Sequence, residues 1–321
     1  MLAFSKNGDS VKIKNVACIG TGFIGEEWAL LFSLKQLNVT VHDSDRNRSK
    51  GLIRNIERRL HYLKRNGLIE ETQIKSALKR LTVHDSIEGA VKDADYVQES
   101  VSENYAVKKR VFREIEKYVD RRALIGSSTS ALSVSEIQKG MRAPGRCVIV
   151  HPMTPVYLMP LVEIVPSPKT SRATTITAQR FMSGLGKVPV VCKKEIPGFI
   201  VNRLQSAIYR EAIDLVNRGV ATVEEIDKVV TRGPALRWTF MGPFLVMHMA
   251  GGEGGIEHWM SHLADSYKLR WDDMATWSAI PQEAKRKVDE GIRGYRFLRQ
   301  RRYVDLLRWR DEKLLKQLKA L

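Results

Sequence analysis

Two spacings of apolar residues alternate along the first 195 residues of the chain. Short apolar runs rich in β-branched residues predict strands that are buried on both faces, and the stretches between them carry apolar residues at helical spacing. The predicted strands lie at 16–19, 39–41, 81–84, 96–98, 123–126, 147–150, 161–165 and 188–192. The predicted helices lie at 23–37, 45–64, 70–78, 108–118 and 170–185, with a short one after Ser133. Because strands and helices alternate, we predict an α/β fold with a doubly wound sheet.

The strand pattern stops after the Pro197-Gly198 turn. Helical spacing then covers 199–217, 223–230 and much of the chain after 255. The apolar residues of 199–217 spread over more than one face, so that helix should be buried on several sides. We therefore predict two domains, an α/β domain at 1–195 and a helical domain at 196–321.

A glycine-rich turn joins the first predicted strand to the first predicted helix. Gly20-Thr-Gly-Phe-Ile-Gly25 has the spacing G-x-G-x-x-G, and Asp43 follows the second strand. In this context the glycines allow a tight turn and the close approach of a pyrophosphate, while the acid binds a ribose hydroxyl. The pattern predicts a Rossmann-type domain that prefers NAD, although Arg46 and Arg48 leave NADP possible. The expected cofactor-binding residues here are Gly20, Gly22, Phe23, Ile24, Gly25 and Asp43.

The composition is that of a globular protein. The hydrophobic fraction is 43%, and no apolar run approaches the ~20 residues that span a bilayer. The first residues show no secretory signal. The three cysteines, Cys18, Cys147 and Cys192, lie in apolar stretches, which favours reduced and packed thiols. We therefore expect a cytoplasmic protein that does not bind a membrane.

The chain carries a formal net charge of +17. This charge suits an anionic ligand but also nucleic acid. The basic residues gather at 46–65 and 293–319 with helical periodicity, which is typical of solvated helix faces, and no nucleic-acid recognition motif is present. No cluster has the spacing of metal ligands. We expect a small anionic or zwitterionic partner, no nucleic acid and no metal.

Polar side chains follow several predicted strands. Glu99 and Glu103 follow 96–98, the serines of 127–130 follow 123–126, and His151 follows 147–150. Glu163 lies in an otherwise apolar strand, where an unpaired carboxylate would cost several kcal/mol. A histidine paired with a carboxylate is the usual general base, although a lone histidine after a strand is more often structural and serines often only cap helices.

These stretches, in this order, resemble the 3-hydroxyacyl-CoA dehydrogenase family over essentially the whole chain. The resemblance rests on Gly20-Thr-Gly-Phe-Ile-Gly25, Gln98-Glu-Ser-Val-Ser-Glu103, Ser127-Ser-Thr-Ser-Ala-Leu132, His151-Pro152 with Leu161-Val-Glu163, Pro197-Gly-Phe-Ile-Val-Asn-Arg-Leu204, and Met241-Gly-Pro-Phe244. It implies an NAD-dependent dehydrogenase that assembles as a homodimer through its helical domain.

The resemblance also implies roles for single residues. His151 is expected to be the general base and Glu163 to hold it. Ser130 and Asn202 are expected to position the substrate's oxygen, and Glu103 and Lys108 match cofactor contacts, as does Ser130. Thr154 is a further expected substrate contact, but it stands where the family is expected to have Asn, so a shorter hydroxyl replaces an amide there.

Two branches of the family that act on free acids are more similar still. His151-Pro-Met-Thr-Pro-Val-Tyr-Leu-Met-Pro-Leu-Val-Glu163 and the segment from Arg237 to Glu253 are similar to L-carnitine dehydrogenases. Other stretches are similar to L-gulonate 3-dehydrogenase, which is also known as lambda-crystallin. Trp238 is the expected aromatic contact for a quaternary ammonium, with Tyr157, Trp259 and Glu253 as further candidates.

We therefore predict NAD-dependent oxidation of a 3-hydroxy acid to a 3-oxo acid, with L-carnitine as the first candidate substrate. The alternatives are L-gulonate, a 3-hydroxyacyl-CoA thioester, or a crystallin-like protein that binds a nucleotide without turnover.

Overall fold

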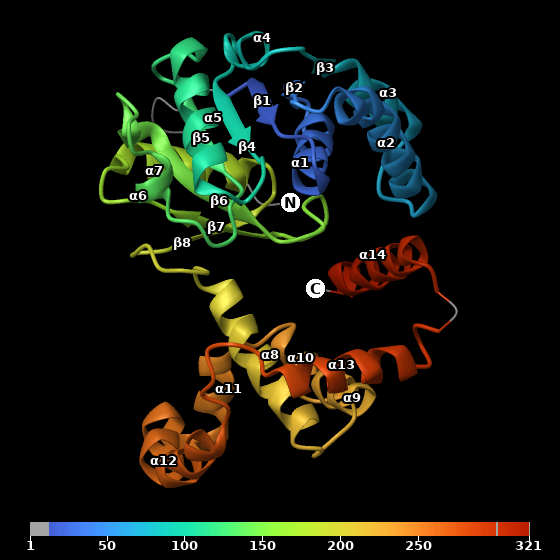
Figure 1. Cartoon of the computed structure of the whole chain (residues 1–321), viewed down its shortest axis with the longest axis vertical. Coiled ribbons are helices and arrows are strands. Elements are labelled where there is room, and N and C mark those ends of the chain that lie inside the picture. Colours follow the sequence, from blue (N-terminus) through green and yellow to red (C-terminus); the bar gives the residue numbers. More distant parts are fainter. Residues whose placement is uncertain (1–12, 300, 321) are drawn as a thin grey trace. The chain divides into compact units, whose positions relative to one another are not determined.

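The computed structural model describes residues 13–299 and 301–320 (Figure 1). The chain divides into two compact units, Met1–Arg203 and Leu204–Leu321. The placement of a domain boundary after residue 195 stays a prediction. The N-terminal stretch in which no secretory signal was expected, residues 1–12, lies outside the described residues.

The described part of the first unit is built on one eight-stranded sheet. Its strands are β1 (Asn15–Ile19), β2 (Asn38–His42), β3 (Leu81–Val83), β4 (Tyr96–Glu99), β5 (Leu124–Ser127), β6 (Cys147–Pro152), β7 (Leu161–Val165) and β8 (Val188–Val191). Their order is β3-β2-β1-β4-β5-β6-β7-β8. Every neighbouring pair is parallel except β6 and β7, which are antiparallel. Because β8 is parallel to β7, the last two strands run opposite to the other six.

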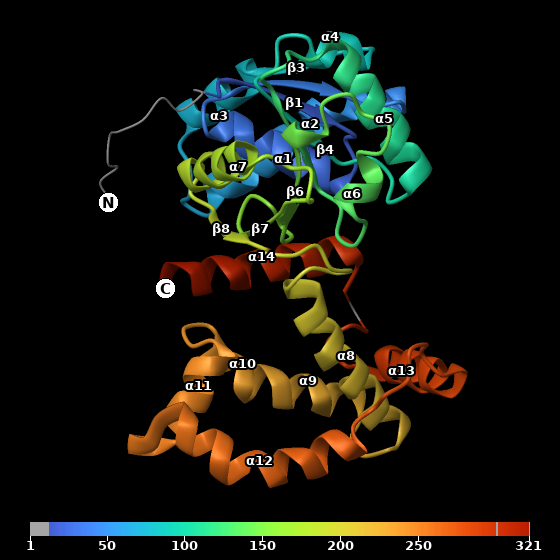
Figure 2. The same ribbon diagram turned by 90° about the vertical axis from the view of Figure 1, so that its left-hand side faces the viewer.

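Helices cover both faces of this sheet (Figures 1 and 2). They are α1 (Phe23–Leu34), α2 (Arg46–Arg65), α3 (Glu71–Lys79), α4 (Ile87–Val91), α5 (Tyr105–Tyr118), α6 (Val134–Ile137) and α7 (Arg172–Gly184), with a 3-10 turn η1 (Pro144–Arg146). The core has two halves: α1, α2, α3 and α7 pack on one face, and α4, α5 and α6 on the other. Successive β1 residues divide between the halves, since Cys18 points to the first and Ile19 to the second. The predicted doubly wound α/β fold is confirmed.

Two local differences from the sequence-based elements have clear causes. Helix α5 begins at Tyr105 rather than at 108, because the Asn104 side chain accepts hydrogen bonds from the next backbone N–H groups and caps the helix. Strand β6 continues through His151 and Pro152 instead of ending before them, because these residues pair with β7. His151 therefore lies on the sheet and not in a loop.

The second unit is helical in its described residues. Helix α8 (Val201–Asn217) leads into it, followed by α9 (Val223–Arg232), α10 (Pro234–Trp238), α11 (Pro243–Ala250), η2 (Gly252–Gly254), α12 (Gly255–Asp273), α13 (Gln282–Gly294) and α14 (Tyr303–Ala320). Helices α8, α9, α10 and α11 have no fully buried residue. Large apolar side chains on them are exposed, among them Leu204, Val229, Leu236 and Phe244. The helix at 199–217 is thus not covered on several sides within one copy of the chain.

Three further features bear on the composition-based expectations. Cys18, Cys147 and Cys192 are buried and free. Within residues 13–299 and 301–320, no helix has the length and apolarity that crossing a bilayer requires. Over the same residues, no group of three or more His, Cys, Asp or Glu side chains is arranged to hold a metal ion.

Candidate active site

The turn between β1 and α1 is shaped by its glycines. Gly20 has a φ of +91°, a left-handed conformation that side chains disfavour. A Cβ on Gly25 would lie 1.8 Å from the carbonyl oxygen of Gly20, so the helix can approach the turn only without a side chain there. Helix α1 begins at Phe23, and the backbone N–H groups of its first turn point along the helix axis toward the glycine turn. This N-terminus suits an anionic pyrophosphate.

Asp43, at the end of β2, holds this turn in place. Its Oδ2 accepts hydrogen bonds from the Thr21 backbone N–H at 2.6 Å and from the Thr21 hydroxyl at 3.0 Å. Its Oδ1 accepts one from the Asp45 backbone N–H at 2.9 Å. Each carboxylate oxygen has further lone pairs, so Asp43 can still accept a hydrogen bond from a ribose hydroxyl.

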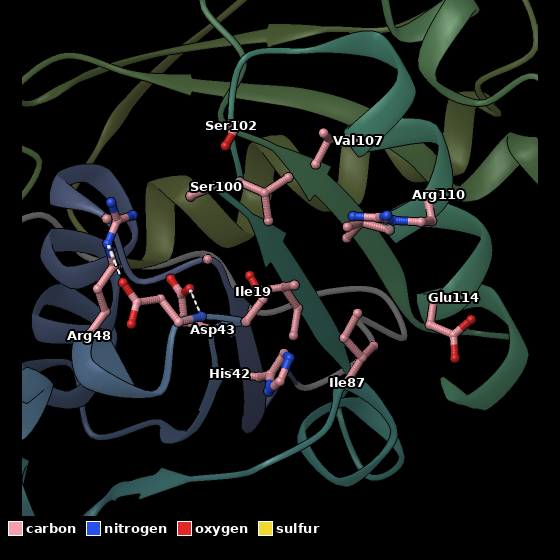
Figure 3. Close-up of a pocket in the computed structure, with 16 residues that line it drawn as sticks. Ile19, His42, Asp43, Arg48, Ile87, Ser100, Ser102, Val107, Arg110 and Glu114 are labelled. Atoms are coloured by element: carbon pink, nitrogen blue, oxygen red, sulfur yellow. Dashed lines mark hydrogen bonds and ion pairs between the residues drawn. The ribbon is translucent and has the colours of Figure 1, made fainter. Parts of the chain in front are cut away.

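A pocket of about 440 Å³ opens beside the turn (Figure 3). Gly20, Gly22 and Asp43 line it together with residues of α4, of α5 and of the loop that follows β4. Figure 3 shows Asp43 and Arg48 on one side of the pocket and Ile87, Val107 and Arg110 on the other. The polar side suits ribose and phosphate, and the more apolar side suits a flat aromatic base. Arg110 and the apolar wall were missed by the sequence analysis, because only folding brings α4 and α5 to this turn.

His151 and Glu163 face each other across the antiparallel strands β6 and β7. His151 Nδ1 lies 2.8 Å from Glu163 Oε2, and both side chains are buried. The other oxygen, Oε1, accepts hydrogen bonds from the backbone N–H groups of Ile200 at 2.8 Å and Val201 at 3.0 Å. Burial alone would raise the pKa of the Glu163 carboxyl, but these hydrogen bonds hold the pKa below its ordinary value.

The pairing fixes the chemistry of the imidazole. An ionised carboxylate only accepts hydrogen bonds, so Nδ1 of His151 carries the proton and Nε2 is left with its lone pair. The Phe199 ring packs against the imidazole with 5.4 Å between the ring centroids. The arrangement can therefore take up a proton at Nε2 and stabilise the resulting positive charge through Glu163.

A partly buried ionic network lies at the end of β4, with Lys108 and Glu99 buried and Glu103 exposed. Lys108 Nζ is 2.8 Å from Glu99 Oε1 and 3.4 Å from Glu103 Oε2. Glu103 Oε1 in turn accepts hydrogen bonds from the Thr129 hydroxyl at 2.6 Å and from the Ser130 backbone N–H at 3.0 Å. Although burial raises the pKa of the Glu103 carboxyl, the hydrogen bonds and Lys108 together lower the pKa. Glu103 and Lys108 thus support the loop that presents Ser130.

Asn202 connects this loop to the histidine pair. Its side-chain amide donates a hydrogen bond to the Ser130 carbonyl oxygen at 2.9 Å. Since the preceding residues Ile200 and Val201 bind Glu163, one short segment at the start of α8 contacts both groups. The structure therefore brings Ser130, His151, Glu163 and Asn202 into one connected set.

The structure also describes other residues that were expected to contact the substrate. Thr154 is exposed in the loop between β6 and β7. Trp238 ends α10 in the second unit and is 42% exposed. Trp259 is buried and its ring lies 4.6 Å from that of Tyr267, so it is a packing residue.

The segment 199–201 was missed as part of the site. Phe199 has a φ of +52°, which is uncommon for a residue other than glycine, and this conformation lets the next N–H groups reach Glu163. The sequence offered the Pro197-Gly198 turn and the family-like stretch 197–204 as signals, but neither indicated this contact with Glu163.

Two family models match the chain. The 3-hydroxyacyl-CoA dehydrogenase NAD binding domain matches residues 15–196, and the 3-hydroxyacyl-CoA dehydrogenase C-terminal domain matches residues 198–292. Among curated relatives, the L-carnitine dehydrogenase of Oceanobacillus iheyensis is 41% identical and the alignment covers 87% of this chain and 89% of that protein. The L-carnitine dehydrogenase of Streptomyces coelicolor is 38% identical, with 96% and 95% covered.

A solved structure extends the comparison. The 5-formyl-3-hydroxy-2-methylpyridine 4-carboxylic acid 5-dehydrogenase, described as an NAD-dependent dismutase, superposes with a TM-score of 0.80 at 25% identity. The superposition covers 96% of this chain and 97% of the chain in that solved structure. These comparisons confirm the predicted family, enzyme class and cofactor, and they count against a crystallin-like protein without turnover. The chain belongs to the 3-hydroxyacyl-CoA dehydrogenase family and is an NAD-dependent hydroxy acid dehydrogenase.

Proposed function

We propose that the protein oxidises the 3-hydroxyl group of L-carnitine to a ketone with NAD, which gives 3-dehydrocarnitine. The observation that carries the chemistry is the buried His151–Glu163 pair, joined through the start of α8 to Ser130 and Asn202. The observation that favours this substrate is the 37–41% identity to L-carnitine dehydrogenases over most of the chain.

Each residue of the connected set has a distinct task in this reaction. His151 Nε2 takes the proton of the substrate hydroxyl, and the Glu163 carboxylate stabilises the imidazolium that forms. Ser130 and Asn202 hold the substrate's oxygen by hydrogen bonds, which strengthen as charge develops there. NAD, when bound at the turn between β1 and α1, supplies the acceptor for the hydride from the same carbon.

Of the residues that we propose to hold NAD, Gly20, Gly22 and Asp43 line the pocket. Gly20, Gly22 and Gly25, with the adjoining Phe23 and Ile24, present the N-terminus of α1 to the pyrophosphate. In this proposal Asp43 binds the adenosine ribose, and Glu103, Lys108 and Ser130 supply further contacts on the cofactor side of the site. We propose residues 1–195 as the NAD-binding domain and 196–321 as the domain for substrate and dimerisation.

The first prediction concerns the choice of cofactor. The protein should prefer NAD, because the Asp43 carboxylate repels a ribose 2′-phosphate. Asp43→Ala should raise the KM for NAD without a comparable loss with NADP, measured as kcat/KM for both cofactors. Equal kcat/KM for NAD and NADP in the unaltered protein would refute this role. Because Asp43 also holds Thr21, Asp43→Asn is the control: it removes the charge but keeps one acceptor oxygen, which can still bind the Thr21 N–H group.

A second prediction concerns the substrate. A quaternary ammonium binds well to an aromatic face, and the exposed ring of Trp238 offers one. Trp238→Ala should raise the KM for L-carnitine more than it lowers kcat, by about fivefold for a contact worth about 1 kcal/mol. Trp259→Phe is the control, since Trp259 is buried. Robust NAD reduction with L-gulonate or a 3-hydroxyacyl-CoA, and none with L-carnitine, would contradict the choice of L-carnitine as the substrate. It would not contradict the proposed role of His151.

The third prediction concerns assembly. We propose a homodimer through the second unit, because α8, α9, α10 and α11 expose large apolar side chains that a monomer would leave in water. Sedimentation at micromolar concentration should give a dimer, and a charge in this surface, such as Phe244→Lys, should shift it toward monomer. An unaltered protein that sediments as a monomer would contradict the proposal.

We also propose that the protein works in the cytoplasm, where three free buried thiols stay reduced.

A further inference from the structure

The loop between β6 and β7 is held at one buried residue, Val156. Its backbone N–H donates a hydrogen bond to Glu27 Oε2 at 2.7 Å. Its carbonyl oxygen accepts one from Lys187 Nζ, which also donates to the Met159 carbonyl oxygen at 2.7 Å. Two side chains of opposite charge, 160 residues apart in sequence, therefore bind the two polar backbone groups of one loop residue.

Both charged groups are themselves buried and partnered. The Glu27 side chain has no exposed surface, and its Oε1 lies 2.9 Å from Arg59 Nη1 on α2. The Lys187 side chain is 8% exposed, and its Nζ lies 5.9 Å from the centroid of the Trp28 ring on α1. Burial and the nearby Lys35 lower the pKa of Lys187 to about 8, against the attraction of Glu27. Burying these charges costs free energy of folding, so stability is a poor explanation for the presence of the two side chains. The position of the loop that they hold is the better explanation.

The loop matters because of what lies at its ends. Two residues before Val156 stands Thr154, and the strand before it ends with His151 and Pro152. On the other side, Glu27 stands two residues after Gly25 in the helix that begins at the glycine turn. Glu27 therefore connects the helix that receives the dinucleotide with the loop that follows the proposed base.

We propose that Glu27 and Lys187 are positioning residues of the dehydrogenase reaction: by holding Val156 they fix the loop 153–160, and with it Thr154 and the end of β6, against the cofactor-binding helix. This inference rests on the proposed function. Misplacing a reacting group by about 1 Å costs up to about a hundredfold in rate, so the expected effect falls on kcat rather than on cofactor affinity.

The test compares four variants of the full-length protein. Lys187→Met keeps the length of the side chain but removes both hydrogen bonds to the loop. Glu27→Ala removes the acceptor of the Val156 N–H, whereas Glu27→Gln keeps an acceptor and should rescue part of the loss. Lys35→Met is the matched control: it removes a charge near Lys187 from the exposed end of α1, where it has no described hydrogen bond to the loop.

Three quantities separate positioning from a general structural role. They are kcat with the hydroxy acid, the affinity for NADH by fluorescence titration, and the hydrogen-exchange rate of the peptide that covers 153–160. Lys187→Met and Glu27→Ala should lower kcat about ten- to a hundredfold and speed exchange in that peptide, with NADH affinity within about twofold. Lys35→Met should change none of the three.

The opposite results are equally clear. Unchanged kcat in Lys187→Met, or a loss of kcat matched by an equal loss of NADH affinity, overturns the inference. If Glu27→Ala does not fold, Glu27→Gln and Lys187→Met decide. Failure of the proposed function would show instead as no L-carnitine turnover by the unaltered protein, while turnover of whichever 3-hydroxy acid is oxidised still tests the loop.

Discussion

Replacement of His151 by alanine should lower kcat by about 10²–10⁴-fold, the usual contribution of a general base. The imidazole is the group whose Nε2 can accept the hydroxyl proton while Nδ1 stays bound to Glu163. Since the glycine turn and Asp43 belong to other strands and loops, the affinity for NAD should remain nearly unchanged. Steady-state kinetics with a 3-hydroxy acid, together with NADH binding by fluorescence, measure the two quantities separately.

Glu163→Gln is the informative companion to this variant. A glutamine whose oxygen accepts the Ile200 and Val201 N–H groups turns its NH2 group toward His151, so Nδ1 becomes the acceptor and Nε2 carries the proton. The imidazole can then no longer accept the hydroxyl proton at Nε2, so kcat should fall about as far as in His151→Ala. The folded state should persist, because a neutral amide can still accept the N–H groups of Ile200 and Val201. A folded His151→Ala protein that retains most of its turnover would show that another residue is the base.

Gly25→Ala should remove cofactor binding and destabilise the first unit. The added Cβ would lie 1.8 Å from the Gly20 carbonyl oxygen and 2.9 Å from its carbonyl carbon, both of which are backbone atoms. Neither atom can move unless the turn opens. The loss in free energy of unfolding should therefore reach or exceed ~3 kcal/mol, which is the upper value for most overpacked cores. Thermal unfolding and NADH titration measure the outcome.

Gly51→Ala provides the matched control. Gly51 lies within α2, and a Cβ there would meet no atom within 4 Å. Alanine is favoured over glycine inside a helix by roughly 0.5–1 kcal/mol, so this variant should be slightly more stable and bind NADH normally. Ordinary NADH affinity and an unchanged melting temperature in Gly25→Ala would mean that the turn tolerates a side chain.

The sequence predicted those parts of the fold that local patterns determine. The strand–turn–helix unit around Gly20 and the helical hairpin of α2 and α3 follow from apolar spacing and turn residues within one short stretch. The direction of β7 could not be predicted in this way, since a buried run such as 161–165 has the same composition in either orientation. Its direction depends on the loop before it, which reverses the chain between Pro152 and Leu161.

The same division holds for the candidate site. A glutamate in an apolar strand indicated a buried partner, and His151 was the natural candidate. The backbone donors to Glu163 could not be foreseen, because they depend on the left-handed conformation of Phe199. Glu27 and Lys187 were also invisible: on a helix and before a strand they are ordinary charged residues, and only tertiary packing buries them beside Val156.

The antiparallel pairing of β6 and β7 ties the proposed acid–base chemistry to the registry of a single hairpin. His151 is paired directly with Glu163, so their side chains lie opposite each other on the same face of the sheet. A slip of one residue would turn one of the two side chains to the opposite face of the sheet. Misaligned chains would therefore be inactive rather than slow, and heating should abolish turnover in step with the melting of this hairpin. The active fraction of a preparation then measures the fraction of molecules in which β6 and β7 are paired in the correct register.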